Sequence, residues 1–235
     1  MRELKEPARA MGVSLSDAQL DRFEVYCREL LAWNRKFNLT AITDRYGVMT
    51  RHFLDSLSCL LAVPRLAGRV IDVGTGAGFP GLPLKIARPH IQLTLVEATG
   101  KKVAFLRHLV GELGLENVTI LHNRIETVGR DPDHREQYRL AVARAVAELR
   151  VLAEYMLPLL RPGGMMLAQK GTDPAAEVAA AARALQVLGG EHRQTMPVAI
   201  PGLPAARHLV LIQKNRPTPA TYPRRAGVPT RKPLG

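Results

Sequence analysis

One stretch of this 235-residue chain restricts the possible folds more than any other. It reads Arg69-Val-Ile-Asp-Val-Gly-Thr-Gly-Ala-Gly-Phe-Pro-Gly81, a short apolar run followed by four closely spaced glycines. An apolar run bounded by glycine is typical of a buried strand. A proline two residues further on suits the first turn of a helix. The stretch therefore predicts a strand, a glycine loop and a helix, in which the backbone can approach a ligand closely because glycine lacks a Cβ.

The spacing of these glycines admits two classes of ligand. Gly76, Gly78 and Gly81 fit the G-x-G-x-x-G pattern of dinucleotide sites, in which a pyrophosphate lies at the helix N-terminus. Asp72 lies two residues before Gly74, and a carboxylate there would repel a pyrophosphate. The pattern Asp-x-Gly-x-Gly-x-Gly instead resembles motif I of the class I S-adenosylmethionine-dependent methyltransferases, whose cofactor carries an ammonium and no phosphate. A turn that binds nothing is the weakest alternative, since isolated turns rarely need so much glycine.

The later part of the chain predicts the same architecture independently. Further strands are expected at 91–96, 118–121, 140–143, 165–169, 191–200 and 208–213. The earlier ones alternate with helices, which favours a parallel sheet. Only a short Pro/Gly connection joins the last two, which requires an antiparallel pair. We therefore predict an α/β, Rossmann-like class I methyltransferase fold: a seven-stranded, mostly parallel sheet with a C-terminal antiparallel hairpin and a small N-terminal helical lobe.

Three segments are expected along the chain. Residues 1–65 are predicted to form the helical lobe, with Ser14 or Ser16 capping its main helix. Residues 66–214 are predicted to form the S-adenosylmethionine-binding domain. Residues 215–235 form a basic tail rich in proline, which is not expected to pack as a regular element. Whether the tail is disordered or lies along a phosphate backbone stays open at this point.

Composition limits the partners and the compartment. The formal net charge of +12 and the sequence pI of about 10.3 favour a polyanionic partner, most simply nucleic acid. Cys27 and Cys59 form no disulfide or metal pattern. The charged residues 1–12 are unlike a signal peptide, and no apolar run is long enough to span a membrane. We expect a cytoplasmic monomer that does not bind membranes.

The chemistry of methyl transfer narrows the target base. Methylation at C5 of a pyrimidine needs a cysteine nucleophile beside the fourth strand, and residues 141–149 contain none. Methylation of an exocyclic amine typically uses an Asp/Asn-Pro-Pro-aromatic loop, whereas this loop reads Arg144-Ala-Val-Ala-Glu148. A ring nitrogen such as guanine N7 needs neither device, because no proton has to be removed. The enzyme would only have to align N7 with the methyl sulfonium, with no covalent enzyme intermediate.

Three other polar residues stand out. Glu97 follows the second strand at about the distance at which such folds place a ribose-binding acid. His52 and Asp55 lie one helical turn apart on one face. They could act as an acid–base pair, but we favour a structural role that ties the helical lobe to the main domain.

Eight segments together carry a family resemblance. They are Trp33-Asn, Asn38-Leu-Thr-Ala-Ile, His52-Phe-Leu-Asp55-Ser56, Asp72-Val-Gly-Thr-Gly-Ala-Gly-Phe-Pro-Gly81, Lys101-Lys102-Val-Ala-Phe, Arg144-Ala with Lys170-Gly, Arg207-His-Leu and Tyr222-Pro-Arg-Arg. On these the chain resembles the bacterial 16S ribosomal RNA guanine-N7 methyltransferases, the glucose-inhibited division protein B family. The resemblance covers nearly the whole chain and implies a guanine in the 530 loop of 16S rRNA, or of the small ribosomal subunit, as the target.

The same resemblance implies the site residues. The cofactor, S-adenosyl-L-methionine, would be bound by Asp72, Gly74, Gly76, Gly78, Phe79, Glu97, Ala98, Thr99, Ile125, Glu126 and Arg144. Within that set, Glu97 to Thr99 would contact the ribose, and Ile125 and Glu126 the adenine. Arg124, Lys170 and Arg207 would face the RNA or the target base as the catalytic set, and no metal is expected.

Overall fold

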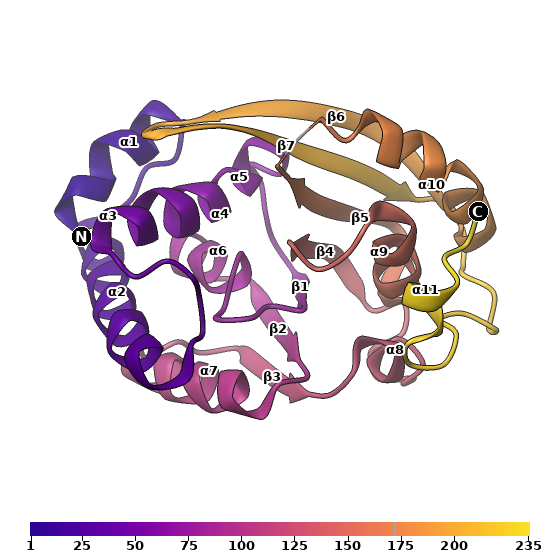
Figure 1. Ribbon diagram of the computed structural model, residues 1–235, viewed down its shortest axis with the longest axis horizontal. Coiled ribbons are helices and arrows are strands. Elements are labelled where there is room, and N and C mark those ends of the chain that lie inside the picture. The colour runs from indigo at the N-terminus through magenta and orange to yellow at the C-terminus, as the bar shows by residue number, and fades with distance from the viewer. Residues whose placement is uncertain (172) are drawn as a thin grey trace.

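The computed structural model describes residues 1–171 and 173–235 and has an α/β architecture (Figure 1). Its strands are β1 (Arg69–Val73), β2 (Gln92–Glu97), β3 (Val118–His122), β4 (Tyr138–Arg144), β5 (Leu160–Lys170), β6 (Gly190–Ile200) and β7 (Leu203–Lys214). Its helices before β1 are η1 (Arg2–Leu4), α1 (Lys5–Ala10), α2 (Asp17–Phe37), α3 (Arg45–Gly47), η2 (Val48–Leu54), α4 (Asp55–Leu57) and α5 (Cys59–Ala62). The later helices are α6 (Gly81–Ala87), α7 (Gly100–Glu112), α8 (Ile125–Val128), α9 (Leu149–Met156), η3 (Leu157–Leu159), α10 (Ala175–Leu188) and α11 (Val228–Arg231).

The strands form one sheet in the order β3-β2-β1-β4-β5-β7-β6. Strands β1 to β5 pair in parallel, whereas β7 runs antiparallel to both β5 and β6. The predicted fold class is therefore confirmed, including the hairpin at the C-terminal edge. The order reverses between β1 and β4, and ligands of such sheets bind at the carboxyl ends of the strands at this switch point.

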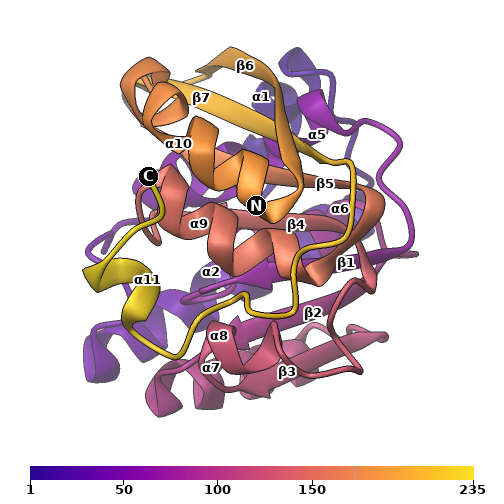
Figure 2. The same ribbon diagram turned by 90° about the vertical axis from the view of Figure 1, so that its right-hand side faces the viewer.

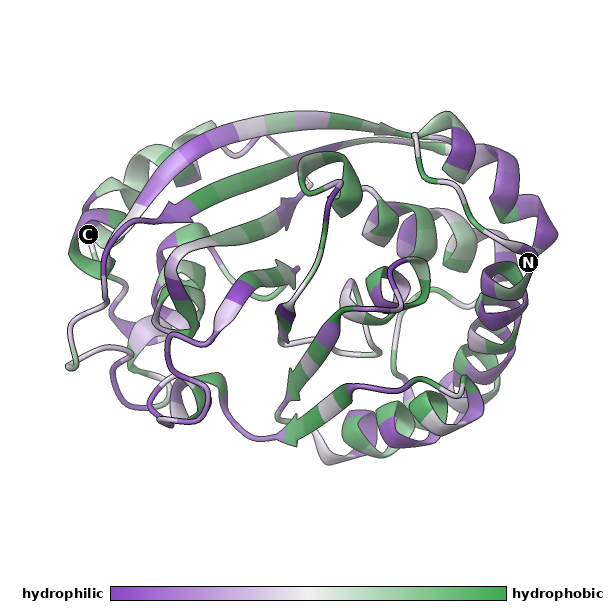
Figure 3. Ribbon diagram, turned by 180° about the vertical axis from the view of Figure 1, so that it is seen from behind, coloured by the Kyte–Doolittle hydropathy of each residue, from purple (hydrophilic) through white to green (hydrophobic). Residues whose placement is uncertain are grey.

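Helices cover both faces of the sheet (Figure 1). The N-terminal helices pack with α6 and α7 on one face, and α9 and α10 pack on the other. Strand β1 contributes to the hydrophobic core on both faces of the sheet, because alternate side chains point to opposite faces. Val70 packs on the face covered by the N-terminal helices, and Ile71 and Val73 pack on the face covered by α9 and α10. The central strands are accordingly hydrophobic along most of their length, while the outer helices carry both hydrophobic and hydrophilic residues (Figure 3).

The main N-terminal helix begins as the sequence predicts. Ser16 Oγ accepts the amide of Gln19 at 3.3 Å, and Gln19 Oε1 accepts the amide of Ser16 at 2.8 Å, so the two residues form a capping box. The helix continues to Phe37 and ends at Asn38, whose φ is 48°. Asparagine tolerates this left-handed conformation, which terminates helices.

The N-terminal helices reach the glycine loop through a buried aromatic cluster. Tyr26 of α2 is fully buried, and its hydroxyl donates to the carbonyl oxygen of Ala77 at 2.6 Å. Its ring stacks on Phe79, with the ring centroids 5.2 Å apart. Residues of the predicted helical lobe therefore support the loop directly from one side.

The Pro-Gly-Gly run at 162–164 lies inside strand β5. The sequence predicts this strand at 165–169, but β5 already begins at Leu160. Its pairing with β4 shifts register between Tyr138 and Leu140, so the run forms an irregularity inside the strand. Bulges tolerate proline and glycine because they leave residues outside the hydrogen-bonded ladder.

The C-terminal tail is mostly irregular, as predicted, but it is packed rather than disordered or extended in solvent. It runs back over α8 and α9, forms the short helix α11 and ends beside α9 and α10 (Figure 2). Arg135 of the main domain holds the tail in place by donating to the carbonyl oxygens of Thr218 and Tyr222, at 2.7 Å each. Thr218 and Pro223 are buried. The contacts with Arg135 use backbone carbonyl oxygens of the tail, which its composition does not reveal.

Among the described residues, no helix is both long and apolar enough to cross a membrane.

The Tyr26 hydroxyl provides a test of the link between α2 and the loop. Replacing Tyr26 by Phe leaves the Ala77 carbonyl oxygen buried without its partner, which should lower the free energy of unfolding by about 1–3 kcal/mol. Urea denaturation measures this. The matched control is Tyr46→Phe, because the Tyr46 side chain is exposed and its hydroxyl lies 3.5 Å from an acceptor; its effect should stay within about 0.5 kcal/mol. Equal effects of the two changes would contradict the proposed link.

Candidate functional site

The glycine loop after β1 depends on backbone conformations that only glycine adopts readily. Gly74 and Gly78 have φ values of 66° and 102°. A Cβ at Gly74 would also lie 2.9 Å from Cγ2 of Val146, and one at Gly78 would lie 2.6 Å from the Tyr26 hydroxyl. The glycines therefore allow both the turn itself and the close approach of neighbouring side chains.

Asp72 holds the loop closed from beneath. Its Oδ2 accepts the Thr75 hydroxyl at 2.6 Å and the Gly81 amide at 2.7 Å, which joins the two ends of the loop. The side chain is fully buried, and burial raises its pKa to about 6. Asp72 thus lies at the base of the loop and not in a cavity wall. Its Oδ1 is buried with no partner among the described residues, so a bound ammonium or water could still satisfy it.

Glu97, at the end of β2, fixes the other side of the loop. Its two carboxylate oxygens accept the amides of Gly76 at 3.0 Å and of Thr99 at 2.8 Å. The side chain lines a cavity of about 290 Å³ at the carboxyl ends of β1 and β2. We call this the first cavity; its lining residues are Val73, Gly74, Val96, Glu97, Ala98, Asn123, Arg124, Ile125, Glu126, Val146, Ala147, Tyr155, Gly227 and Thr230.

The first cavity gathers part of the predicted cofactor set. Five predicted cofactor residues line it: Gly74, Glu97, Ala98, Ile125 and Glu126. Gly76, Gly78 and Thr99 shape the loop around it through their backbones. The sequence interpretation missed the contributions from Val146, Ala147, Tyr155, Gly227 and Thr230. Nothing in the local sequence marks these residues, because α9 and the tail meet the loop only in the folded chain.

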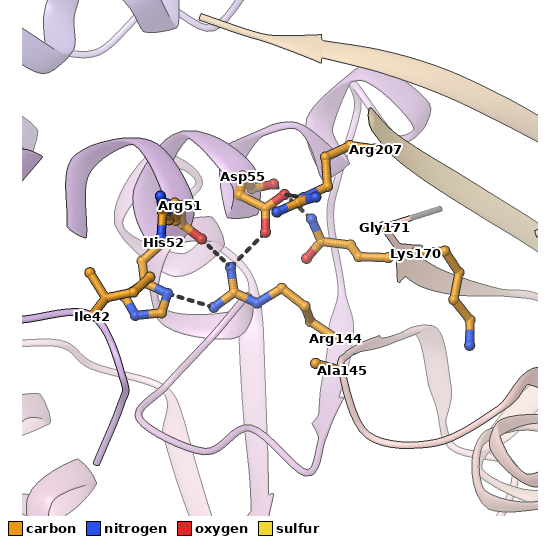
Figure 4. A pocket seen from close by; sticks show the side chains of 10 residues that line it. Ile42, Arg51, His52, Asp55, Arg144, Ala145, Lys170, Gly171 and Arg207 are labelled. Atoms are coloured by element: carbon orange, nitrogen blue, oxygen red, sulfur yellow. Dashed lines mark hydrogen bonds and ion pairs between the residues drawn. The ribbon is translucent and has the colours of Figure 1, made fainter. Parts of the chain in front are cut away.

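A second cavity of about 440 Å³ lies on the other side of the loop that follows β4 (Figure 4). Its lining residues are Ile42, Arg51, His52, Asp55, Arg144, Ala145, Gln169, Lys170, Gly171 and Arg207. Ala145 lines this cavity, while the next two residues, Val146 and Ala147, line the first. The two cavities are therefore neighbours that share the loop at 145–147 as a wall.

Arg144 is the centre of the second cavity and does not line the first. Its Nη1 donates to Asp55 Oδ2 at 2.8 Å, and its Nη2 donates to His52 Nδ1 at 3.0 Å (Figure 4). Arg207 Nε contacts the other Asp55 oxygen at 3.2 Å. Asp55 lies between two guanidinium groups with only 5% of its side chain exposed, so its charge is compensated in place. The guanidinium of Arg144 also lies over Phe79, 5.0 Å from the ring centroid.

His52 is a neutral hydrogen-bonding group in this network. Burial, and then the charge of Arg144, lower the pKa of His52 to about 3. Its Nδ1 accepts from Arg144, so its Nε2 carries the proton and donates to Thr40 Oγ1 at 2.9 Å. The structural role predicted for His52 and Asp55 agrees with the geometry, except that Arg144 joins them and they do not bond one another.

The three residues predicted as catalytic are not brought together. Arg124 lines the first cavity. Lys170 lines the second, but its ammonium donates to Glu177 at 2.6 Å and to the Ala147 carbonyl oxygen at 2.9 Å, pointing away from Arg144 (Figure 4). Of the three, Arg207 alone joins the network around Asp55. In the described part of the chain, no cluster of histidine, cysteine and acidic residues could hold a metal ion.

Comparison with solved structures identifies the fold. A 16S rRNA (adenine(1408)-N(1))-methyltransferase from Catenulisporales acidiphilia matches with a TM-score of 0.53 at 15% identity, covering 64% of this chain and 86% of that one. The YcgJ protein from Bacillus subtilis matches with a TM-score of 0.52 at 16% identity, covering 68% and 98%.

Sequence comparison is far more specific. A ribosomal RNA small subunit methyltransferase G from a Roseiflexus species is 55% identical over 231 residues, 98% of each chain. One from Chloroflexus aggregans is 55% identical over 233 residues, 99% of this chain and 98% of the relative. The profile of the GidB family, described as rRNA small subunit methyltransferase G, matches residues 19–210. On this evidence the chain belongs to the rRNA small subunit methyltransferase G family, as its sequence motifs predict.

Proposed function

We propose that this chain methylates N7 of a guanine in the 530 loop of 16S rRNA, using S-adenosylmethionine as the donor. Family membership makes it an S-adenosylmethionine-dependent methyltransferase of small-subunit rRNA. The base, the ring position and the residue roles are our proposal. The observation that supports it most is the pair of cavities on either side of the 145–147 loop.

The first cavity suits the donor. A methyl sulfonium cofactor has a ribose with two hydroxyls, which a carboxylate at a strand end can accept; Glu97 occupies that position. Glu126 and Ile125 line the same cavity and are available to an adenine. Asp72 does not line the cavity and supports it by closing the glycine loop. With two carboxylates and the single arginine Arg124 among its lining residues, the cavity suits S-adenosylmethionine better than a pyrophosphate.

The second cavity suits the acceptor base and its backbone. It is larger, and Arg51 and Arg207 give it positive charge. Arginine donors can bind phosphate or the O6 atom of guanine. Arg144 is bound to Asp55 and His52, so we assign it to shaping the floor between the cavities rather than to the direct cofactor contact that the sequence predicts. With a net charge of +12, the chain as a whole favours an RNA partner.

The reaction needs no general base from this site. The donor supplies an electrophilic methyl group on sulfur. The N7 lone pair of guanine is free, and no proton leaves when it is methylated, so the protein's task is alignment. His52 could not accept a proton easily, because its Nδ1 lone pair already accepts from Arg144 and its pKa is lowered to about 3. A site built for proton removal would need such a group to be available.

Mapping the product tests the proposed function directly. Small-subunit particles and naked 16S rRNA from a strain lacking the modification are each incubated with the protein and a labelled methyl donor, and the labelled base is then located. We expect one labelled guanine in the 530 loop, methylated at N7. Label on another base or another guanine atom would refute the proposal, whichever substrate form is preferred.

The pH dependence of the chemical step tests the absence of a base. We expect the single-turnover rate of methyl transfer to change by less than about twofold between pH 7 and 8.5, a range above the pKa of about 6 of Asp72, because neither guanine N7 nor the neutral His52 gains or loses a proton there. The rate is measured at saturating donor and RNA. A rate that rises tenfold per pH unit over part of this range would show that a proton is removed.

Arg207 provides a test of the RNA surface. Arg207→Ala should weaken RNA binding and lower the slope of log K against log salt by about one, since one phosphate contact is lost. Filter binding at several salt concentrations measures both. The matched control is Arg183→Ala on α10, an exposed arginine that does not line the second cavity, which should leave the slope unchanged. An unchanged slope in Arg207→Ala would remove this residue from the RNA surface.

A further inference from the structure

The C-terminal tail is fastened to α9 by a buried ion pair. Glu154 has only 1% of its side chain exposed, and Arg224 Nε and Nη2 donate to its two oxygens at 2.8 and 2.6 Å. The backbone amide of Arg224 also donates to Glu154, at 2.8 Å. Three donors from one tail residue therefore satisfy a carboxylate that would otherwise be buried and unpaired. A surface strand that merely rests on the domain would not need such a contact.

Beyond this ion pair the tail enters the wall of the first cavity. The amide of Gly227 donates to Glu126 Oε1 at 2.8 Å, so the tail orients a carboxylate that lines the cavity. The hydroxyls of Tyr155 and Thr230 lie 2.9 Å apart, and both residues line this cavity. Gly227 and Thr230 are themselves lining residues. Figure 2 shows this part of the tail, with α11, beside α8 and α9.

We propose that Arg224 together with residues 227–231, here called the C-terminal clamp, forms the outer wall of the cofactor site and helps to hold the adenine end of S-adenosylmethionine. Arg224 acts as a positioning residue: it contacts Glu154 and places Gly227 and Thr230 against the cavity. The inference rests on the proposed function, because it takes the first cavity to be the donor site.

The same contacts argue against the RNA role that a basic tail suggests. The guanidinium of Arg224 is engaged by Glu154 and is not free for a phosphate. The neighbouring Arg225 is exposed, and its side chain makes no hydrogen bond or ion pair within the described residues. Arg224 and Arg225 are therefore a matched pair: they share charge and position in the sequence, but only the first fastens the clamp.

The test compares four proteins: wild type, Arg224→Ala, Arg224→Lys and Arg225→Ala. Calorimetric titration measures their affinity for S-adenosylhomocysteine, and steady-state kinetics measures KM and kcat with S-adenosylmethionine and RNA. We expect Arg224→Ala to weaken the binding of S-adenosylhomocysteine and to raise KM for S-adenosylmethionine about tenfold. The value of kcat and the salt slope of RNA binding should stay unchanged. Arg224→Lys should be intermediate, because lysine keeps the charge but loses the planar fork. Arg225→Ala should bind S-adenosylhomocysteine with the affinity of the wild type.

Hydrogen exchange on the wild-type protein keeps the test independent of any folding defect in Arg224→Ala. S-adenosylhomocysteine should slow exchange of the amides in 224–231, that of Gly227 among them. Equal affinity of Arg224→Ala and Arg225→Ala, or no added protection of 224–231 in a wild-type protein that binds the ligand, would overturn the inference. A lower salt slope in Arg224→Ala would also overturn it. A wild-type protein that binds no S-adenosylhomocysteine would instead refute the proposed donor site.

Discussion

The buried carboxylate of Asp72 is the contact on which the candidate site depends. It accepts from Thr75 and Gly81, the two ends of the glycine loop, and so determines how the chain leaves β1 and enters α6. A carboxylate can do this in a dry environment because hydrogen bonds to a charged acceptor are strong, although burial raises its pKa to about 6. Glu97 supports the loop from β2 and Tyr26 supports it from α2. Three elements distant in sequence therefore converge on one short loop, and the first cavity lies beside it.

The two cavities are lined by different kinds of side chain. The first is lined by strand ends, two acidic residues, apolar side chains and one arginine, Arg124. Under the proposed function, its two carboxylates suit a donor that carries positive charge and hydroxyl groups. The second is lined by arginines, with one buried carboxylate that fixes two of them. Removing Asp55 would leave two guanidinium groups without the carboxylate between them, so under the proposed function this residue shapes the RNA side and does not transfer protons. Under the same proposal, the donor and the base lie on either side of the 145–147 loop.

The C-terminal tail is basic in composition, but part of its charge is neutralised by contacts within the protein. Its composition suggests a solvated or phosphate-bound strand, yet its contacts run to Glu126, Glu154 and the backbone-binding Arg135. The excess positive charge that a nucleic-acid partner requires is therefore not supplied by Arg224, whose charge is compensated within the protein. The basic residues that remain available near the second cavity are better placed to meet RNA.

The sequence by itself determined the strand–loop–helix unit and the antiparallel end of the sheet, because local spacing and hydrophobic period encode these features directly. The combination of its motifs indicated the family and, through it, part of the first cavity. Glu97 lines that cavity, as its position after the second strand predicts, and so do Ile125 and Glu126, as the family resemblance implies. Only the tertiary structure decided that Arg144 lies in the second cavity, that Arg124 and Arg207 face different cavities, and that Gly227 and Thr230 complete the first. The physical reason is that these placements depend on which charges find partners across the sheet. Asp55 binds Arg144 and Arg207, and Glu154 binds Arg224, through contacts 70 or more residues apart that no local pattern records.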